Sequence, residues 1–298
     1  MNKTVKIILI VAACMIPIGL FTAFLGVTFG GTTAWALDIN NPQAPALTNI
    51  SSKSIELKEF DTLAIETFSA DVVIESGDSY KLEYAAYEGK DPVMTEEGGK
   101  LTIGQPSGTM SLFSFGNAMN LDRYTITVPA TAGEIALDLK AASGDVFIRD
   151  VKVSGQVKLS SGDIALNEIE GSSIDVSTNS GEVTGTAMDV RTVKLASLSG
   201  DIQVSETYAD SISCTASSGD VNVQYTMAND VNCETHSGDI NINLSGDMEE
   251  FSYDISTNSG DILVNDMDGG KHYQEAGTGD KTVKAKANSG DITVEIGG

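Results

Sequence analysis

The sequence predicts an all-β fold: a parallel β-solenoid with coils of about nineteen residues, preceded by an irregular β-rich part and an N-terminal transmembrane helix. Three observations lead to this fold class. A Ser-Gly-Asp-like tripeptide recurs eight times, apolar residues alternate with period two on both sides of it, and a long uncharged apolar run opens the chain. The architecture is that of a single-stranded β-helix, in which each coil buries its apolar face only by stacking on the next.

The N-terminus is predicted to be a membrane segment. Residues 1–6 form a basic, cytoplasmic n-region with Lys3 and Lys6, and residues 7–36 carry no charge. About 20 apolar residues suffice to cross a bilayer, and this run exceeds the core of an ordinary signal peptide. We therefore expect a single-pass anchor in the cell membrane with the bulk of the chain outside, as the positive-inside rule requires.

Two alternatives to the anchor stay open. The small-x-small sequence Ala34-Trp35-Ala36 has the form of a cleavage site, and cleavage near Ala36 would release a secreted protein. The stretch Val11-Ala12-Ala13-Cys14 has the form of a lipidation motif, although the apolar run continues after it instead of turning polar.

Charge limits the partners that such an exported chain can have. Residues 38–298 hold 16 basic and all 42 acidic residues, a net charge of −26. A field of this sign repels phosphate backbones, so we expect no binding to nucleic acid.

The segment between the membrane and the repeat is less regular. Residues 37–50 are interpreted as a linker, and residues 51–133 as an irregular β region that caps the N-terminal end of the solenoid. Within it, Ser69-Ala70-Asp71-Val72 is a degenerate copy of the repeat, 74 residues ahead of Gly144 and close to four repeat lengths away. This region is thus a candidate for early coils of the same stack.

One apolar stretch in this region, residues 110–119, stands out from polar surroundings. It either folds onto the end of the solenoid as part of the cap or forms an exposed patch for a partner or the membrane. Under the second interpretation, the candidate partner-binding residues are Leu112, Phe113, Phe115 and Met119.

The repeat occupies residues 134–298. Its tripeptides are centred on Gly144, Gly162, Gly181, Gly200, Gly219, Gly238, Gly260 and Gly290, at steps of 18, 19, 19, 19, 19, 22 and 30 residues. Positions two and four after each glycine, and five and seven before it, are almost all apolar, while the positions between them are mostly polar. This pattern indicates a strand, a sharp turn and a second strand, with four inward columns when coils stack in register. The last, 30-residue step contains residues 266–281, interpreted as a hairpin that covers the C-terminal end.

An acidic residue follows each repeat glycine, which creates the strongest candidate for a ligand site. The column consists of Asp145, Asp163, Glu182, Asp201, Asp220, Asp239, Asp261 and Asp291. Carboxylates about 5 Å apart would repel each other, and calcium could bridge them. The alternative is structural: glycine supplies a positive φ, and the Ser and Asp side chains bond nearby backbone amides. We favour the structural interpretation, because the paired glycine-rich corners of calcium β-rolls are absent, and we expect no other cofactor.

Other chemistry is weakly represented. The two histidines, His236 and His272, have no metal-ligand or triad spacing. Cys214 and Cys233 are 19 residues apart in one inward column, so they are either two small buried hydrophobes or a stacked pair near disulfide geometry.

The repeat resembles that of the bacterial putative-adhesin family of β-strand-repeat surface proteins, a family defined as a domain of unknown function. The resemblance rests on the corner repeats of residues 143–291, on Tyr124-Thr125-Ile126-Thr127-Val128-Pro129 before them, and on the ending Ser289-Gly290-Asp291-Ile292-Thr293-Val294. It covers roughly residues 50–298 and implies a solenoid fold. It implies no catalytic residue.

We therefore expect a non-enzymatic, adhesin-like surface scaffold that binds an envelope protein or a wall polymer through its solenoid faces. One alternative is a regulator that accompanies a cell-envelope stress signalling system, motivated by the anchor and residues 110–119. A second alternative is a carbohydrate-active solenoid enzyme, because paired carboxylates on neighbouring coils have the separation that glycoside cleavage requires.

Overall fold

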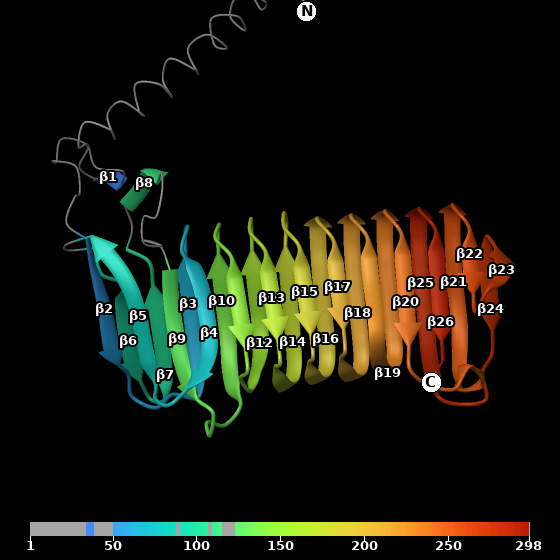
Figure 1. Ribbon diagram of the computed structural model, residues 1–298, viewed down its shortest axis with the longest axis horizontal. Coiled ribbons are helices and arrows are strands. Elements are labelled where there is room, and N and C mark those ends of the chain that lie inside the picture. The colour runs from blue at the N-terminus through green and yellow to red at the C-terminus, as the bar shows by residue number, and fades with distance from the viewer. Residues whose placement is uncertain (1–33, 39–49, 88–89, 107–108, 115–122, 298) are drawn as a thin grey trace, which may run out of the picture.

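The computed structural model describes residues 34–38, 50–87, 90–106, 109–114 and 123–297. These residues form an all-β structure whose main sheet stays open and is not closed into a barrel. Figure 1 shows it as a row of coils with the N-terminal strands at one end and the hairpin β23–β24 at the other. The predicted all-β solenoid is confirmed by this arrangement of parallel coils.

Each regular coil contains two strands joined by the Ser-Gly-Asp tripeptide, which we term the first corner. Strands that lead into the corner form one face, the leading sheet, and strands that follow it form the opposite face, the following sheet. The regular coils comprise β10 (Ile135–Ala141), β11 (Val146–Arg149), β12 (Val153–Leu159), β13 (Ile164–Asn167), β14 (Glu170–Thr178), β15 (Val183–Thr186), β16 (Asp189–Ser199), β17 (Ile202–Ser205), β18 (Tyr208–Ser218) and β19 (Val221–Ser237), which runs through both faces.

The coils stack in parallel and in register, which aligns the apolar columns inferred from the sequence. In the following sheet Val146 pairs with Ile164 and Ile164 with Val183, and all three side chains are buried. Burial of one such side chain contributes about 1.5–3 kcal/mol, and every coil adds to the same continuous core. The column four residues after the repeat glycines lacks a side chain at Gly185. There the Met188 methyl group occupies the space that a Cβ would take.

The stack begins ahead of residue 134. Strands β3 (Thr62–Thr67) and β4 (Asp71–Gly77) form a coil that pairs in parallel with β10 and β11, so that Leu63 lies beside Leu137 and Val72 beside Val146. This confirms Ser69-Ala70-Asp71-Val72 as a degenerate first corner. One coil further out, β7 (Lys100–Gly104) pairs with β3, and β9 (Arg123–Pro129) pairs with β4.

Antiparallel strands close the N-terminal end. Strand β5 (Lys81–Tyr87) pairs with β9 and β2 (Ile50–Glu56) pairs with β5, while β6 (Val93–Glu97) pairs with β7. Tyr84 and Tyr124 pack edge to face beneath them, with ring centroids 6.3 Å apart. A separate antiparallel pair joins β1 (Ala34–Asp38) to β8 (Thr109–Ser114).

The C-terminal coils depart from the order of the sequence. Strands β25 (Lys281–Ser289) and β26 (Ile292–Ile296) lie between the coil of β19 and β20 (Ile240–Leu244) and the coil of β21 (Phe251–Ser259) and β22 (Ile262–Val264), as Figure 1 shows. The corners therefore do not follow one another in sequence order at this end. The 30-residue step lets the chain leave the stack and return one coil earlier.

The insertion of β25 and β26 before the coil of β21 and β22 leaves that coil last in the stack, where a hairpin covers it. Strands β23 (Met267–Gly270) and β24 (His272–Glu275) run antiparallel to β22 and β21, and a short 3-10 turn, η1 (Met248–Glu250), precedes β21. The hairpin predicted for residues 266–281 thus covers the last coil and occupies edges that could otherwise pair with another chain.

The expected membrane segment, residues 7–36, lies outside the described residues except for 34–36, which are extended in β1. Among the described residues, no helix is long and apolar enough to cross a membrane.

Candidate functional site

The first corner is dictated by the contact between neighbouring coils. All eight repeat glycines have φ between 104° and 149°, a region that favours glycine. A Cβ on Gly219 would also meet the carbonyl oxygen of Gly200 in the preceding coil, and the same kind of contact recurs along the column. The glycines therefore serve both the turn and the close approach of backbones.

The acidic column has a structural role. The carboxylate of Asp145 accepts the backbone N–H of Asp163 at 2.9 Å, and that of Asp163 accepts the N–H of Glu182 at 2.8 Å. The same bond, at 2.8–3.0 Å, joins Asp71 to Asp145, Asp201 to Asp220, Asp220 to Asp239, Asp239 to Asp291 and Asp291 to Asp261. The interpretation of these residues as caps of the turn backbone is confirmed.

Glu182 is the exception within the column. Its longer side chain accepts a hydrogen bond from Gln203 Nε2 at 2.7 Å, on the outer surface of the following sheet. At the end of the column, Asp261 lies 3.3 Å from Lys271 Nζ in an exposed ion pair. Across the described residues no group of three or more His, Cys, Asp or Glu side chains is arranged to hold a metal ion.

A second ladder at the first corner was missed by the sequence reasoning. Three residues before the glycine, buried hydroxyls donate to the carbonyl oxygen of the corner glycine in the preceding coil. These bonds are Thr178 to Gly162 (3.4 Å), Ser197 to Gly181 (3.1 Å), Thr235 to Gly219 (3.1 Å) and Thr257 to Gly290 (3.0 Å). The sequence does carry a sign of this ladder: the position three residues before the repeat glycine lies on the inward side of the alternating pattern and holds mostly small or hydroxyl-bearing residues.

The remaining sequence candidates fall in separate places. Cys214 and Cys233 are buried neighbours in register on β18 and β19, and both thiols are free. Hydrogen bonding to Cys214, and then burial, raises the pKa of the Cys233 thiol. His236 and His272 are exposed on β19 and β24.

The partner-binding candidates of residues 110–119 are not placed. Leu112 and Phe113 belong to β8, where only the backbone is described, and Phe115 and Met119 lie outside the described residues.

Opposite the first corner, the chain turns back at what we term the second edge: residues 150–154, 168–173, 187–192, 206–211 and 225–230. Its turn positions hold Asp150, Glu168, Ala187, Glu206 and Tyr225, all with φ of 51–53° although none is glycine. The sequence reasoning missed this column because it varies in residue type. A non-glycine residue at positive φ is strained and leaves its side chain at the surface.

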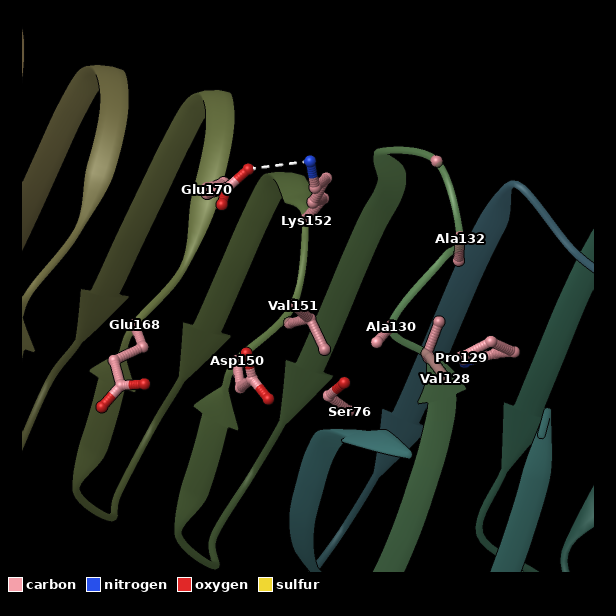
Figure 2. A pocket seen from close by; sticks show the side chains of 11 residues that line it. Ser76, Val128, Pro129, Ala130, Ala132, Asp150, Val151, Lys152, Glu168 and Glu170 are labelled. Atoms are coloured by element: carbon pink, nitrogen blue, oxygen red, sulfur yellow. Dashed lines mark ion pairs between the residues drawn. The ribbon is translucent and has the colours of Figure 1, made fainter. Parts of the chain in front are cut away.

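Two recesses lie along the second edge. The first, of about 110 Å³, lies between the strand end at Pro129 and the turns at Asp150 and Glu168. Figure 2 shows Lys152 and Glu170 pointing toward each other there from neighbouring coils, and their charged atoms are 2.9 Å apart. The carboxylates of Asp150 and Glu168 lie below this ion pair in the same view.

The second recess, which we term the second-edge groove, is larger, about 440 Å³, and differs in character. Tyr208 and Met227 line it, together with the charged residues Asp189, Arg191, Asp210 and Lys281, the last of which is ion-paired with Glu250 at 2.7 Å. Tyr208 is 58% exposed and Met227 42%, and the adjacent turn residue Tyr225 is 71% exposed. Elsewhere on the solenoid the outward positions are mostly polar, with Phe147, Leu198 and Leu263 among the exposed apolar exceptions.

A third recess, about 510 Å³, lies on the following sheet near the N-terminal end. Phe147, Arg123 and Arg149 are among the residues that line it. Arg149 is ion-paired with Glu75, and Arg123 lies 3.3 Å from Asp71. Both guanidinium groups thus bind carboxylates on β4.

Comparison with known proteins concerns the fold more than the site. Residues 60–295 match the family described as Toastrack DUF4097. No curated protein matches the chain. Solved structures with similarity include a "putative lipid binding protein" from Parabacteroides distasonis ATCC 8503, at 19% identity over 82% of this chain and 96% of that one, with a TM-score of 0.49.

Two further structures are similar at the same level. A "putative adhesin" from Bacteroides fragilis NCTC 9343 is 15% identical over 83% of this chain and 97% of that one, with a TM-score of 0.45. A "putative adhesin" from Parabacteroides merdae ATCC 43184 is 15% identical over 83% of this chain and 95% of that one, with a TM-score of 0.46. None of the three reaches a TM-score of 0.5, so the likeness does not extend to a ligand or an activity.

Proposed function

The chain belongs to the Toastrack DUF4097 family, and from that premise and the surfaces described above we propose that it is a non-enzymatic, adhesin-like scaffold that binds an envelope component through the outer surface of its solenoid. In this proposal the N-terminal segment, residues 7–36, anchors the chain in the cell membrane, and the solenoid lies outside the cell.

The observation that carries the proposal is the contrast between a rigid interior and a varied second edge. The interior is fixed by apolar columns, by the aspartate ladder and by buried hydroxyls, which together leave little freedom for loops to close over a substrate. The second edge presents Tyr208, Tyr225 and Met227 to solvent, and none of these three side chains belongs to the buried core.

Such residues suit recognition by contact. Tyr and Met are enriched in the cores of protein interfaces, and a preorganised rod loses little conformational entropy when it binds. The acidic column at the first corner is a weaker candidate for binding, because the fold already uses its carboxylates as caps. The proposal therefore assigns binding to the second edge rather than to the aspartates.

Site-specific photo-crosslinking of the full chain in intact cells that naturally produce it tests this function. Crosslinkers replace Met227 on the second edge, Leu198 beside the first corner, or Phe113 in β8. We expect capture of one envelope component from position 227 and little from 198.

Two results would overturn the proposal. Capture of a membrane protein from position 113 alone would favour the alternative of a regulator in the membrane plane. Release of sugar ends from wall polymers by the purified chain, abolished when corner aspartates are replaced, would establish an enzyme instead.

A further inference from the structure

The second-edge groove exposes aromatic and thioether side chains at two consecutive coils. Register pairing places Tyr208 directly beside Met227, while Tyr225 is the turn residue of the coil that carries Met227. Their exposed fractions are 58, 42 and 71%. Exposed apolar surface next to a recess marks an interaction site, and Tyr is prominent among residues that carry binding energy.

The charge of the same edge changes along the stack. The pairing column runs from Glu170 to Asp189, Tyr208 and Met227, so a charged half precedes an apolar half. The five stretches of the second edge contain seven acidic residues and two basic ones, a net charge of −5. An occupant must therefore be complementary to carboxylates at one end and to apolar groups at the other.

Both basic residues of the edge are already paired. Lys152 lies 2.9 Å from Glu170, and Arg191 lies 3.9 Å from Asp210. Within the described part of the chain, three exposed carboxylates have no cation within 4 Å: Asp189, which lines the groove, and Glu168 and Glu206 at turns of the same edge. Cations from outside the chain can therefore approach them, and an ammonium or guanidinium group can also contact the faces of the tyrosines.

From this surface we infer that the second edge, including its groove, binds an extended, Lys- or Arg-bearing segment of a partner protein, with its basic residues on the carboxylates of the edge and its apolar residues on Tyr208, Tyr225 and Met227. The inference rests on the proposed function and specifies its partner.

The dimensions of the edge fit a short segment. The four steps from the coil of Asp150 to that of Tyr225 span about 19 Å at the strand spacing of a sheet, which an extended chain covers in about six residues. A protein segment is favoured over a glycan because Met227 offers an apolar, adaptable contact and no hydrogen-bonding group for hydroxyls.

The test uses the full chain and a fluorescent octapeptide of four lysines followed by four apolar residues. Anisotropy titrations at physiological salt compare it with an analogue that has glutamates in place of lysines and with an oligomer of N-acetylglucosamine. We expect saturable binding of the lysine peptide alone. The triple variant Tyr208→Ser, Tyr225→Ser, Met227→Ser should weaken it at least about ten-fold without any change in charge.

The matched control is the double variant Leu198→Ser, Leu263→Ser, which removes exposed apolar side chains elsewhere on the solenoid and should change binding less than about two-fold. Circular dichroism confirms that each variant is folded. Equal weakening by both variants, absence of binding by the lysine peptide, or binding of the glycan that the triple variant abolishes would each overturn the inference. Capture of an envelope component at position 227 in cells, together with no binding of the lysine peptide, would sustain the proposed function while rejecting a basic segment as the occupant.

Discussion

Replacement of Gly219 by alanine tests the origin of the repeat glycines. This residue has φ of +149°, and an added Cβ would collide with the carbonyl oxygen of Gly200 in the neighbouring coil. Two penalties then combine: backbone strain of about 1–3 kcal/mol and a forced shift of packed backbone of about 1–3 kcal/mol. We expect Gly219→Ala to destabilise the solenoid by the sum of the two, about 2–6 kcal/mol.

Two matched glycines separate these penalties. Gly98 has φ of +59° with open space around its Cβ position, so Gly98→Ala should cost only the strain, about 1 kcal/mol. Gly133 has open space and no positive φ, so Gly133→Ala should be neutral or stabilise by up to about 1 kcal/mol.

Urea unfolding followed by circular dichroism gives the overall effect, and hydrogen exchange of the amides around the first corner locates it. Local measurement is needed because stacked repeats depart from two-state behaviour. If Gly219→Ala and Gly133→Ala unfold within about 0.5 kcal/mol of each other, the close approach of backbones at the corner is not what requires glycine.

Further predictions concern the two ladders, the cysteines and the coil order. Asp220→Ala removes the acceptor for the Asp239 N–H and should cost about 1 kcal/mol in urea unfolding, whereas Asp220→Asn, which keeps an acceptor, should cost less; equal losses would contradict capping. Thr235→Val strands the Gly219 carbonyl and should cost about 1–2 kcal/mol, while Thr235→Ser should retain most of the stability. Cys214 and Cys233 should resist a thiol reagent in the folded chain and react in urea. Because the pKa of Cys233 is raised in the fold, its contribution to stability is complete below the unfolded thiol pKa and is lost as pH rises above it. The urea midpoint should therefore fall in alkali, and the fall should be smaller in Cys233→Ala, where only groups such as Tyr84 and Tyr253, whose pKa is raised to about 12, still contribute. Ser237→Cys with Ser289→Cys should form a disulfide under mild oxidation, whereas Ser237→Cys with Ser259→Cys should not; the reverse result would restore the sequence order of coils.

Most of the regular solenoid could be predicted from the sequence, because two independent patterns repeat with the same period. Glycine at the corner and apolar residues at fixed offsets, such as Val146 and Ile148, leave little freedom in register. The degenerate corner at Ser69-Ala70-Asp71 was also readable, since Asp71 retains the capping carboxylate.

The coil order at the C-terminal end could not be predicted. The corners at Gly260 and Gly290 carry the same pattern, so either could pack against Gly238. Only the hairpin β23–β24, which must pair with an outermost coil, decides that β21 and β22 lie last.

The second edge was missed for a related reason. Its turn residues share a backbone conformation but no residue type, and positive φ at Glu168, Glu206 or Tyr225 leaves no signature in composition. The aspartates recur at a fixed position of the repeat, whereas the exposed tyrosines lie where the repeat is least regular.

Oxidative footprinting of exposed side chains tests the central claim, that the second edge is occupied when the protein is at work. Hydroxyl radicals modify exposed Tyr and Met readily, so the rates at Tyr208, Tyr225 and Met227 are compared between the purified full chain and the chain in intact cells. The account predicts a marked fall at these three residues in cells and unchanged rates at Met267 and Leu198, which are 47 and 53% exposed elsewhere on the solenoid. Equal rates at the second edge in both states would contradict it.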